Sequence, residues 1–110
     1  MSIIKRNQID SFKVDGETTI NRYNYSTDTY DIVEGVFNGP HGIVLNKTST
    51  KTYYIISGTG VFEIDDINYH VEEGDIIEVK PNHWLTIQGQ NLKALIITSP
   101  KFNPADELWK

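Results

Sequence analysis

Hydrophobic and polar positions alternate along short runs of this chain, and turn residues separate the runs. The segment from Val61 to Ile64 alternates in hydrophobicity, which predicts a β-strand with one buried face. The segment from Leu95 to Ile97 is apolar throughout, which suits a strand covered on both faces. Turn residues recur at intervals of about 8–12 residues, a spacing typical of a β-sandwich or β-barrel. The predicted strands are residues 19–25, 30–37, 41–45, 52–56, 61–64, 67–71, 76–79, 84–88 and 92–98.

Helical periodicity is not sustained in any segment, so the pattern predicts an all-β fold. The tail is the one exception. Asn103 can cap, and Pro104 can begin, one short helical turn near the C-terminus. Repeats and long linkers are missing, and 110 residues are enough to bury one core. We therefore expect a single domain over residues 1–110.

Composition and charge exclude several classes of partner. The net charge is −5 and the ten basic residues are scattered, so a nucleic-acid partner is not expected. Runs of 18 or more apolar residues are missing, so we expect no membrane partner. No apolar stretch follows Lys5 and Arg6, so a secretory signal is not expected either. With zero cysteines, the chain offers no disulfide and no zinc–sulfur site, and a cytoplasmic location fits best.

The glycine pattern separates a barrel from an immunoglobulin-like sandwich. Gly58 and Gly60 flank a tight corner and Gly74 opens a later strand, at places where positive φ is needed. The segments 53–60 (YYIISGTG) and 74–82 (GDIIEVKPN) resemble the two conserved motifs of the small single-domain cupins, and the resemblance covers about residues 39–98. It implies a double-stranded β-helix, the cupin jelly-roll barrel, whose mouth holds the functional site.

The resemblance also shows what this chain lacks. The two family motifs hold a metal ion through three histidines and one glutamate, and none of those positions carries a metal ligand here. Counted from Gly58 and Gly74, the glutamate position is Lys51, the last histidine position is Leu85, and the first two are Leu45 and Lys47, or Val44 and Asn46 with a longer gap. A divalent cation needs neutral imidazole or anionic carboxylate donors. We therefore expect no metal and no other cofactor, as in a metal-free subgroup of the family.

Alternation along the strands predicts which residues face the pocket. An inward Lys51 brings Tyr53 to the same side, and an inward Leu85 brings His83. His41 follows a Gly-Pro turn near the entrance. The predicted ligand pocket consists of His41, Leu45, Lys47, Lys51, Tyr53, His83 and Leu85.

Two pairs of residues in this pocket carry candidate chemistry. Lys47 and Lys51 either bind an anionic ligand, or act as a base or Schiff-base amine if buried, or lie in water on a polar rim loop. His83 and Tyr53 are the candidate catalytic residues, because imidazole and phenol transfer protons. Each also has a structural interpretation: His83 can bond a turn, and Tyr53 can fill the barrel with its ring.

The sequence thus predicts a metal-independent small cupin that binds a small molecule, of an anionic or a sugar-like class, and leaves open whether it is an enzyme. The alternative is a metal-free sugar isomerase or epimerase that uses His and Tyr in acid–base chemistry. Because an open jelly roll has edge strands that need covering, we also expect a homodimer.

Overall fold

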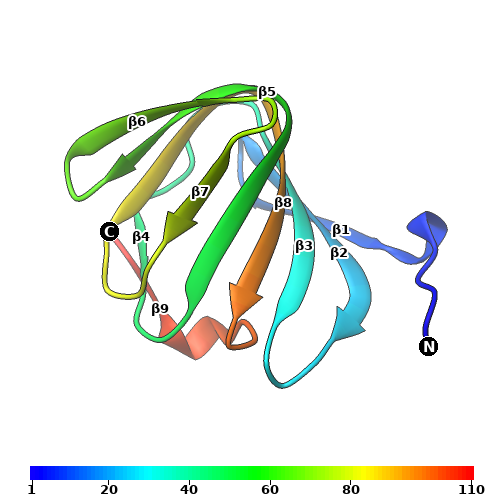
Figure 1. Ribbon diagram of the computed structural model, residues 1–110. Helices are drawn as coiled ribbons and strands as arrows, with labels where there is room; N and C mark the ends of the chain where they lie inside the picture. The colour runs from blue at the N-terminus through cyan, green and yellow to red at the C-terminus, as the bar shows by residue number, and fades with distance from the viewer.

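The computed structural model describes the backbone of residues 1–110 and all side chains except those of Asn24 and Ser26. The described residues form one antiparallel sheet of nine strands that curls into a half-barrel (Figure 1). The predicted all-β fold is confirmed. The elements are η1 (Arg6–Gln8), β1 (Asp10–Asp15), β2 (Thr18–Ser26), β3 (Asp31–Phe37), β4 (Val44–Asn46), β5 (Thr50–Ile64), β6 (Ile67–Glu72), β7 (Ile76–Val79), β8 (Leu85–Ser99), η2 (Pro104–Asp106) and β9 (Glu107–Trp109).

Two long strands, β5 and β8, hold the sheet together. Each was expected as two short strands, but each runs through its glycine-containing corner without a break. They pair along nearly their whole length, and the register shifts between Ile55 and Ser57 and again between Ser57 and Thr59. Such bulges bend a strand and increase its twist, so the two strands curl together rather than turn back. The C-terminal half of β8 also pairs with β3, which extends the sheet to β2 and β1.

The corner of β5 requires glycine for two reasons. Gly58 has φ +81, a conformation that side chains with a Cβ rarely adopt. A Cβ at this position would lie 2.1 Å from the carbonyl oxygen of Asn91 in β8. The positive φ predicted here and at Gly74 is confirmed, with φ +89 at Gly74, whereas the positive φ expected at Gly60 is wrong.

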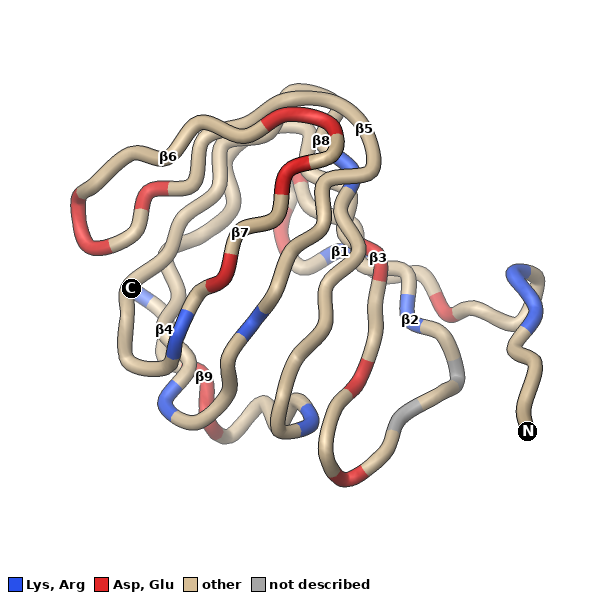
Figure 2. The backbone as a smooth tube through the Cα atoms, in the orientation of Figure 1, with Lys and Arg blue, Asp and Glu red and all other residues tan. Residues whose placement is uncertain are grey.

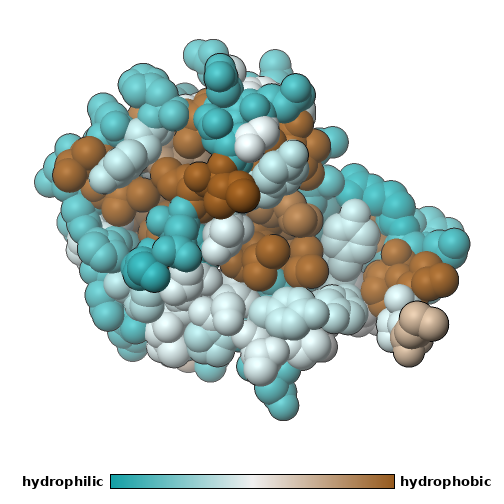
Figure 3. All heavy atoms as spheres, in the orientation of Figure 1, coloured by the Kyte–Doolittle hydropathy of each residue, from teal (hydrophilic) through white to brown (hydrophobic). Residues whose placement is uncertain are grey.

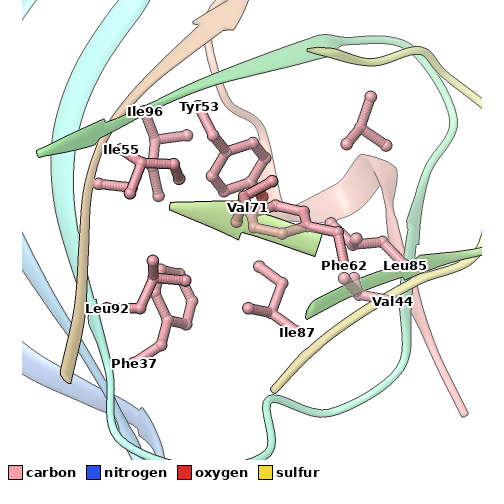
Figure 4. Packing of buried hydrophobic residues seen from close by; sticks show 12 residues of the cluster. Phe37, Val44, Tyr53, Ile55, Phe62, Val71, Leu85, Ile87, Leu92 and Ile96 are labelled. Carbon is pink, nitrogen blue, oxygen red and sulfur yellow. The ribbon is translucent and has the colours of Figure 1, made fainter. Parts of the chain in front are cut away.

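The inward faces of the strands form one hydrophobic core (Figure 4). On β5 the predicted alternation is confirmed: Tyr53 and Ile55 are buried, whereas Tyr54 and Ile56 are 45% and 38% exposed. The rings of Tyr53 and Phe62 meet edge to face with centroids 4.9 Å apart. Burial of each such large side chain contributes about 2 kcal/mol to the free energy of unfolding.

The outer surface carries both apolar and charged regions. Figure 3 shows hydrophobic residues exposed on the face of the molecule in view. The exposed large side chains of β5, β7 and β8 are Tyr54, Ile56, Ile76 and Ile97. Acidic residues gather on the β6 hairpin and in the turn before β7, while basic segments are spread over the chain (Figure 2). The expected homodimer stays a prediction. None of the helices formed by the described residues is long and apolar enough to cross a membrane.

Both ends of the chain add strands that the sequence pattern did not predict. At the N-terminal end, β1 pairs with β2 and extends the sheet. At the C-terminal end the expected helical turn is confirmed as η2, where the Asn103 side chain accepts a 3.0 Å hydrogen bond from the amide of Ala105. This turn leads directly into β9, which pairs with β4 and places Glu107 opposite Asn46.

Replacement of Gly58 by alanine should lower the free energy of unfolding by more than about 2 kcal/mol, because left-handed backbone costs roughly 1–2 kcal/mol without glycine and the new Cβ meets the backbone of β8. Chemical denaturation measures this change. Gly16→Ala is the matched control, since its Cβ would meet nothing within 4 Å and a change within about 0.5 kcal/mol is expected. Equal stability of the two variants would contradict the structure of the corner.

Candidate functional site

A cavity of about 150 Å³ lies between strands β1, β2, β3, β5 and β8 and the C-terminal tail. Most of its wall is apolar, and its apolar aromatic residues are Phe12, Phe37, Phe102 and Trp109. The polar side chains on its wall are Arg22, Asp31, His41, Lys51, Tyr53 and Thr98. A mostly apolar cavity with a few convergent polar groups is typical of a small-molecule site.

His41 is the titratable base of this cavity. Its ring lies between those of Phe37 and Trp109, with centroids 5.9 and 5.5 Å away. Its backbone is fixed from both sides, since its amide donates to the carbonyl of Ile87 at 2.7 Å and its carbonyl accepts the hydroxyl of Thr86. The ring atom Nδ1 is buried without a hydrogen-bond partner among the described groups.

Burial lowers the pKa of His41 below its ordinary value, and the nearby charge of Lys51 lowers it further, against an opposing effect of Asp15. The imidazole is therefore neutral at neutral pH. A neutral imidazole that faces a cavity can accept a proton from a bound molecule. From the sequence, His41 was expected only near the entrance, and the candidate catalytic residues were His83 and Tyr53.

Lys51 lines the same cavity and forms an ion pair with Glu107. The ammonium Nζ lies 2.8 Å from Oε1 of Glu107, and the two side chains are 14% and 7% exposed. On the other side the ammonium lies 5.7 Å from the ring centroid of Phe102. Because the ammonium is engaged by a buried carboxylate, the interpretation of Lys51 as a free amine base or Schiff-base nucleophile loses support.

Tyr53 lines the cavity beside this pair and is only 4% exposed. Burial raises the pKa of Tyr53 far above its ordinary range, and the carboxylate of Glu107 adds to the effect. The phenol therefore stays protonated. It can donate a hydrogen bond to a ligand, but it cannot serve as a base at neutral pH.

Leu45 lies on β4 and Lys47 just after it, and neither of these predicted pocket residues lines the cavity. Val44 belongs to the hydrophobic core, whereas Leu45 faces the opposite side of the strand and pairs with Leu108 of β9. Lys47 is exposed in the loop that follows. Of the two registers that the sequence left open, the structure has the one that points Val44 and Asn46 inward.

His83 and Leu85 also do not line the cavity. Leu85 is 2% exposed in the core, where β8 begins. His83 precedes the strand, so the alternation of β8 does not extend to its side chain. Its ring instead hydrogen-bonds the carboxylate of Asp65, which also accepts the amide of Trp84 at 3.0 Å. These two hydrogen bonds lower the pKa of Asp65. His83 therefore bonds a turn, which is the structural role considered for it from the sequence.

The positions that the cupin resemblance assigns to metal ligands do converge. Val44, Asn46, Lys51 and Leu85 line one void of about 10 Å³. The oxygen of Asn46 already accepts the amides of Thr48 and Ser49, at 2.9 and 2.6 Å. The remaining three offer two hydrocarbons and a cation, so this set does not fit a metal ion. Elsewhere, no group of three or more His, Cys, Asp or Glu among the described residues is placed to hold one.

Four residues of the site were not predicted from the sequence: Arg22, Asp31 and Trp109, which line the cavity, and Glu107, which pairs with Lys51. Arg22 and Asp31 lie on predicted strands, at a distance in sequence from the recognisable motifs. Glu107 and Trp109 lie on β9, which has only three residues and shows no periodicity that could be detected. A lone charged residue on a strand carries no local signal of the long-range contacts that it makes.

The lowered pKa of His41 should make the protein less stable in acid. Below about pH 6.5, the ordinary pKa of histidine, the unfolded chain binds a proton that folded His41 resists, so the free energy of unfolding falls as the pH decreases. Urea denaturation at about pH 7.5 and pH 5 should show a larger loss for the native protein than for His41→Gln. The exposed His70→Gln should retain the full loss. An equal loss in all three proteins would mean that His41 titrates like a solvated histidine.

Solved structures with the same fold support the resemblance to cupins, although no family model and no curated protein sequence matches the chain. Streptomyces PAC13 with uridine has a TM-score of 0.93 at 22% identity, over 100% of this chain and 90% of that chain. Pac13 is described as a unique nucleoside dehydratase. KdgF from Halomonas sp. has a TM-score of 0.81 at 13% identity, over 96% and 98% of the two chains.

A third solved structure is itself described as a cupin. An RmlC-like cupin from Shewanella frigidimarina has a TM-score of 0.72 at 15% identity, over 86% of both chains. At these identities the likeness concerns the fold. Together with the two glycine motifs and the curled antiparallel sheet, it identifies this chain as a small cupin-fold domain.

Proposed function

We propose that this protein binds a neutral, hydroxylated small molecule of the nucleoside type and that His41 moves a proton on it without the help of a metal ion. The observation that carries this proposal is a neutral, half-buried imidazole in the wall of an apolar cavity. The set of side chains at the family's metal positions supports metal independence, because it offers no suitable donors.

The shape and charge of the cavity favour such a ligand. Aromatic walls suit a flat heterocyclic ring, and hydroxyl groups can bond to the polar side chains between them. Lys51 is compensated by Glu107, and Arg22 shares the cavity wall with Asp31. Because the ammonium of Lys51 is paired and the carboxylate of Asp31 also lies in the wall, a neutral molecule is favoured over the anionic ligand considered from the sequence.

The chemistry that we propose is removal of water, by analogy with the nucleoside dehydratase that shares the fold. An imidazole can remove a carbon-bound proton where a neighbouring carbonyl accepts the electron pair, so the substrate carries a carbonyl group. The proton passes to His41 and an enolate forms. The enolate then reforms the carbonyl, a double bond forms between the deprotonated carbon and the next carbon, and the hydroxide that leaves this next carbon takes the proton from His41 to become water. No oxidant or reductant is needed.

The isomerase or epimerase alternative has weaker support. Inversion at carbon needs a second group that exchanges a proton on the opposite face of the substrate. Tyr53 is the predicted partner, and its raised pKa prevents it from acting as a base. Elimination needs one base that later returns its proton, which a single histidine provides.

Uridine should bind in the cavity, and nucleosides with a carbonyl group in the sugar should lose water. Calorimetric or NMR titration with uridine measures binding, and mass spectrometry detects a product lighter by one water molecule. His41→Gln should keep the binding but lower kcat by at least about 100-fold, because general base catalysis contributes roughly 10²–10⁴.

The control for this experiment is His70→Gln, which removes an exposed imidazole from β6 and should act like the native protein. The acidic limb of the kcat/KM profile should lie below the ordinary histidine pKa, since the pKa of His41 is lowered. Failure of native protein to bind uridine or to dehydrate any nucleoside would refute the proposal.

A further inference from the structure

Of the four metal-ligand positions that line the 10 Å³ void, one carries a positively charged side chain, Lys51. Lys51 lines this void and also lines the larger cavity that holds His41. Its side chain is 14% exposed, so most of its charge is away from bulk water. The chain therefore holds a positive charge at the edge between the family's metal position and the cavity.

We propose that the Lys51 ammonium, held in place by Glu107, is the electrophilic group of this site: it donates a hydrogen bond to the carbonyl oxygen of the substrate, which becomes negative when His41 removes the neighbouring proton. This inference rests on the function proposed above. A metal ion would stabilise the same oxygen at this place, and the ammonium supplies that charge from the chain itself.

The surroundings of the ammonium support this role. Its only side-chain hydrogen bond among the described residues is the one to Glu107, and an ammonium has three N–H donors. Phe102 covers another side at 5.7 Å. Fixed donors in a dry cavity stabilise a developing oxyanion far more than donors in water, because they need no reorganisation.

Glu107 acts as a positioning residue. Its side chain is 7% exposed. Glu107 lies on β9 opposite Asn46 of β4, so the pairing of these two strands fixes the position of Glu107 beside Lys51. Its second oxygen, Oε2, is buried without a hydrogen-bond partner among the described groups, so Lys51 is the group that satisfies this carboxylate. The two charges of the pair have opposite effects on His41, since the ammonium lowers the pKa of the imidazole and the carboxylate raises it.

Turnover of a nucleoside with a sugar carbonyl tests the electrophilic role. Lys51→Met should lower kcat by at least about 100-fold, as removal of one oxyanion donor does, and Lys51→Arg should restore part of it. Because Lys51→Met leaves a buried carboxylate unpaired, the double variant Lys51→Met with Glu107→Gln is measured beside it. Lys47→Met removes an exposed ammonium nearby and should have no effect. Full activity of a folded Lys51→Met variant or of the double variant would overturn this inference while the proposed function stands.

An NMR titration of His41 in labelled protein tests the same pair without any ligand. Relative to native protein, Lys51→Met should raise the pKa of His41 and Glu107→Gln should lower it. A general loosening of the site that exposes His41 to water would instead raise the pKa of His41 in both variants, toward the ordinary pKa of histidine. If native protein turns over no nucleoside, the proposed function fails and this titration decides: opposite shifts support the charged pair, and unchanged or parallel shifts overturn it.

Discussion

The pairing of β5 with β8 is the constraint on which the rest of this structure depends. Both strands have 15 residues, and they stay paired through a corner where the backbones come so close that only glycine fits at position 58. Because the pair bends at this corner, the sheet curls and its inner face encloses a core. The same curvature brings Lys51 and Tyr53 of β5 into one cavity with His41, whose backbone amide donates a hydrogen bond to the carbonyl of Ile87 in β8.

The cavity combines a charged acid with a neutral base, and burial produces this combination. Desolvation disfavours the charged form of every group, so a lone histidine becomes neutral and a lone lysine would do so too. Lys51 has a partner instead, because Oε1 of Glu107 lies 2.8 Å from its ammonium. The wall of the cavity thus holds an ion-paired ammonium and a neutral imidazole.

The sequence predicted most of the fold because the features of the fold are local. Alternation gave the inward faces of β5 correctly, and the positions of positive φ followed from Gly58 and Gly74. The site was predicted less well, because its residues come together only through long-range pairing. His83 was placed in the pocket by extending the alternation of a strand that begins two residues later. Leu45 and Lys47 followed from one of two possible gaps, and a change of one residue in register moves every side chain to the other face.

The C-terminal tail shows why a short segment can decide the chemistry of a small barrel. β9 has three residues, yet it delivers Glu107 to the ammonium of Lys51 and Trp109 to the ring of His41. Without that carboxylate, Lys51 would be a buried cation with no partner, which is a costly arrangement. A strand outside the two glycine motifs therefore supplies the partner of a charged residue in the cavity wall.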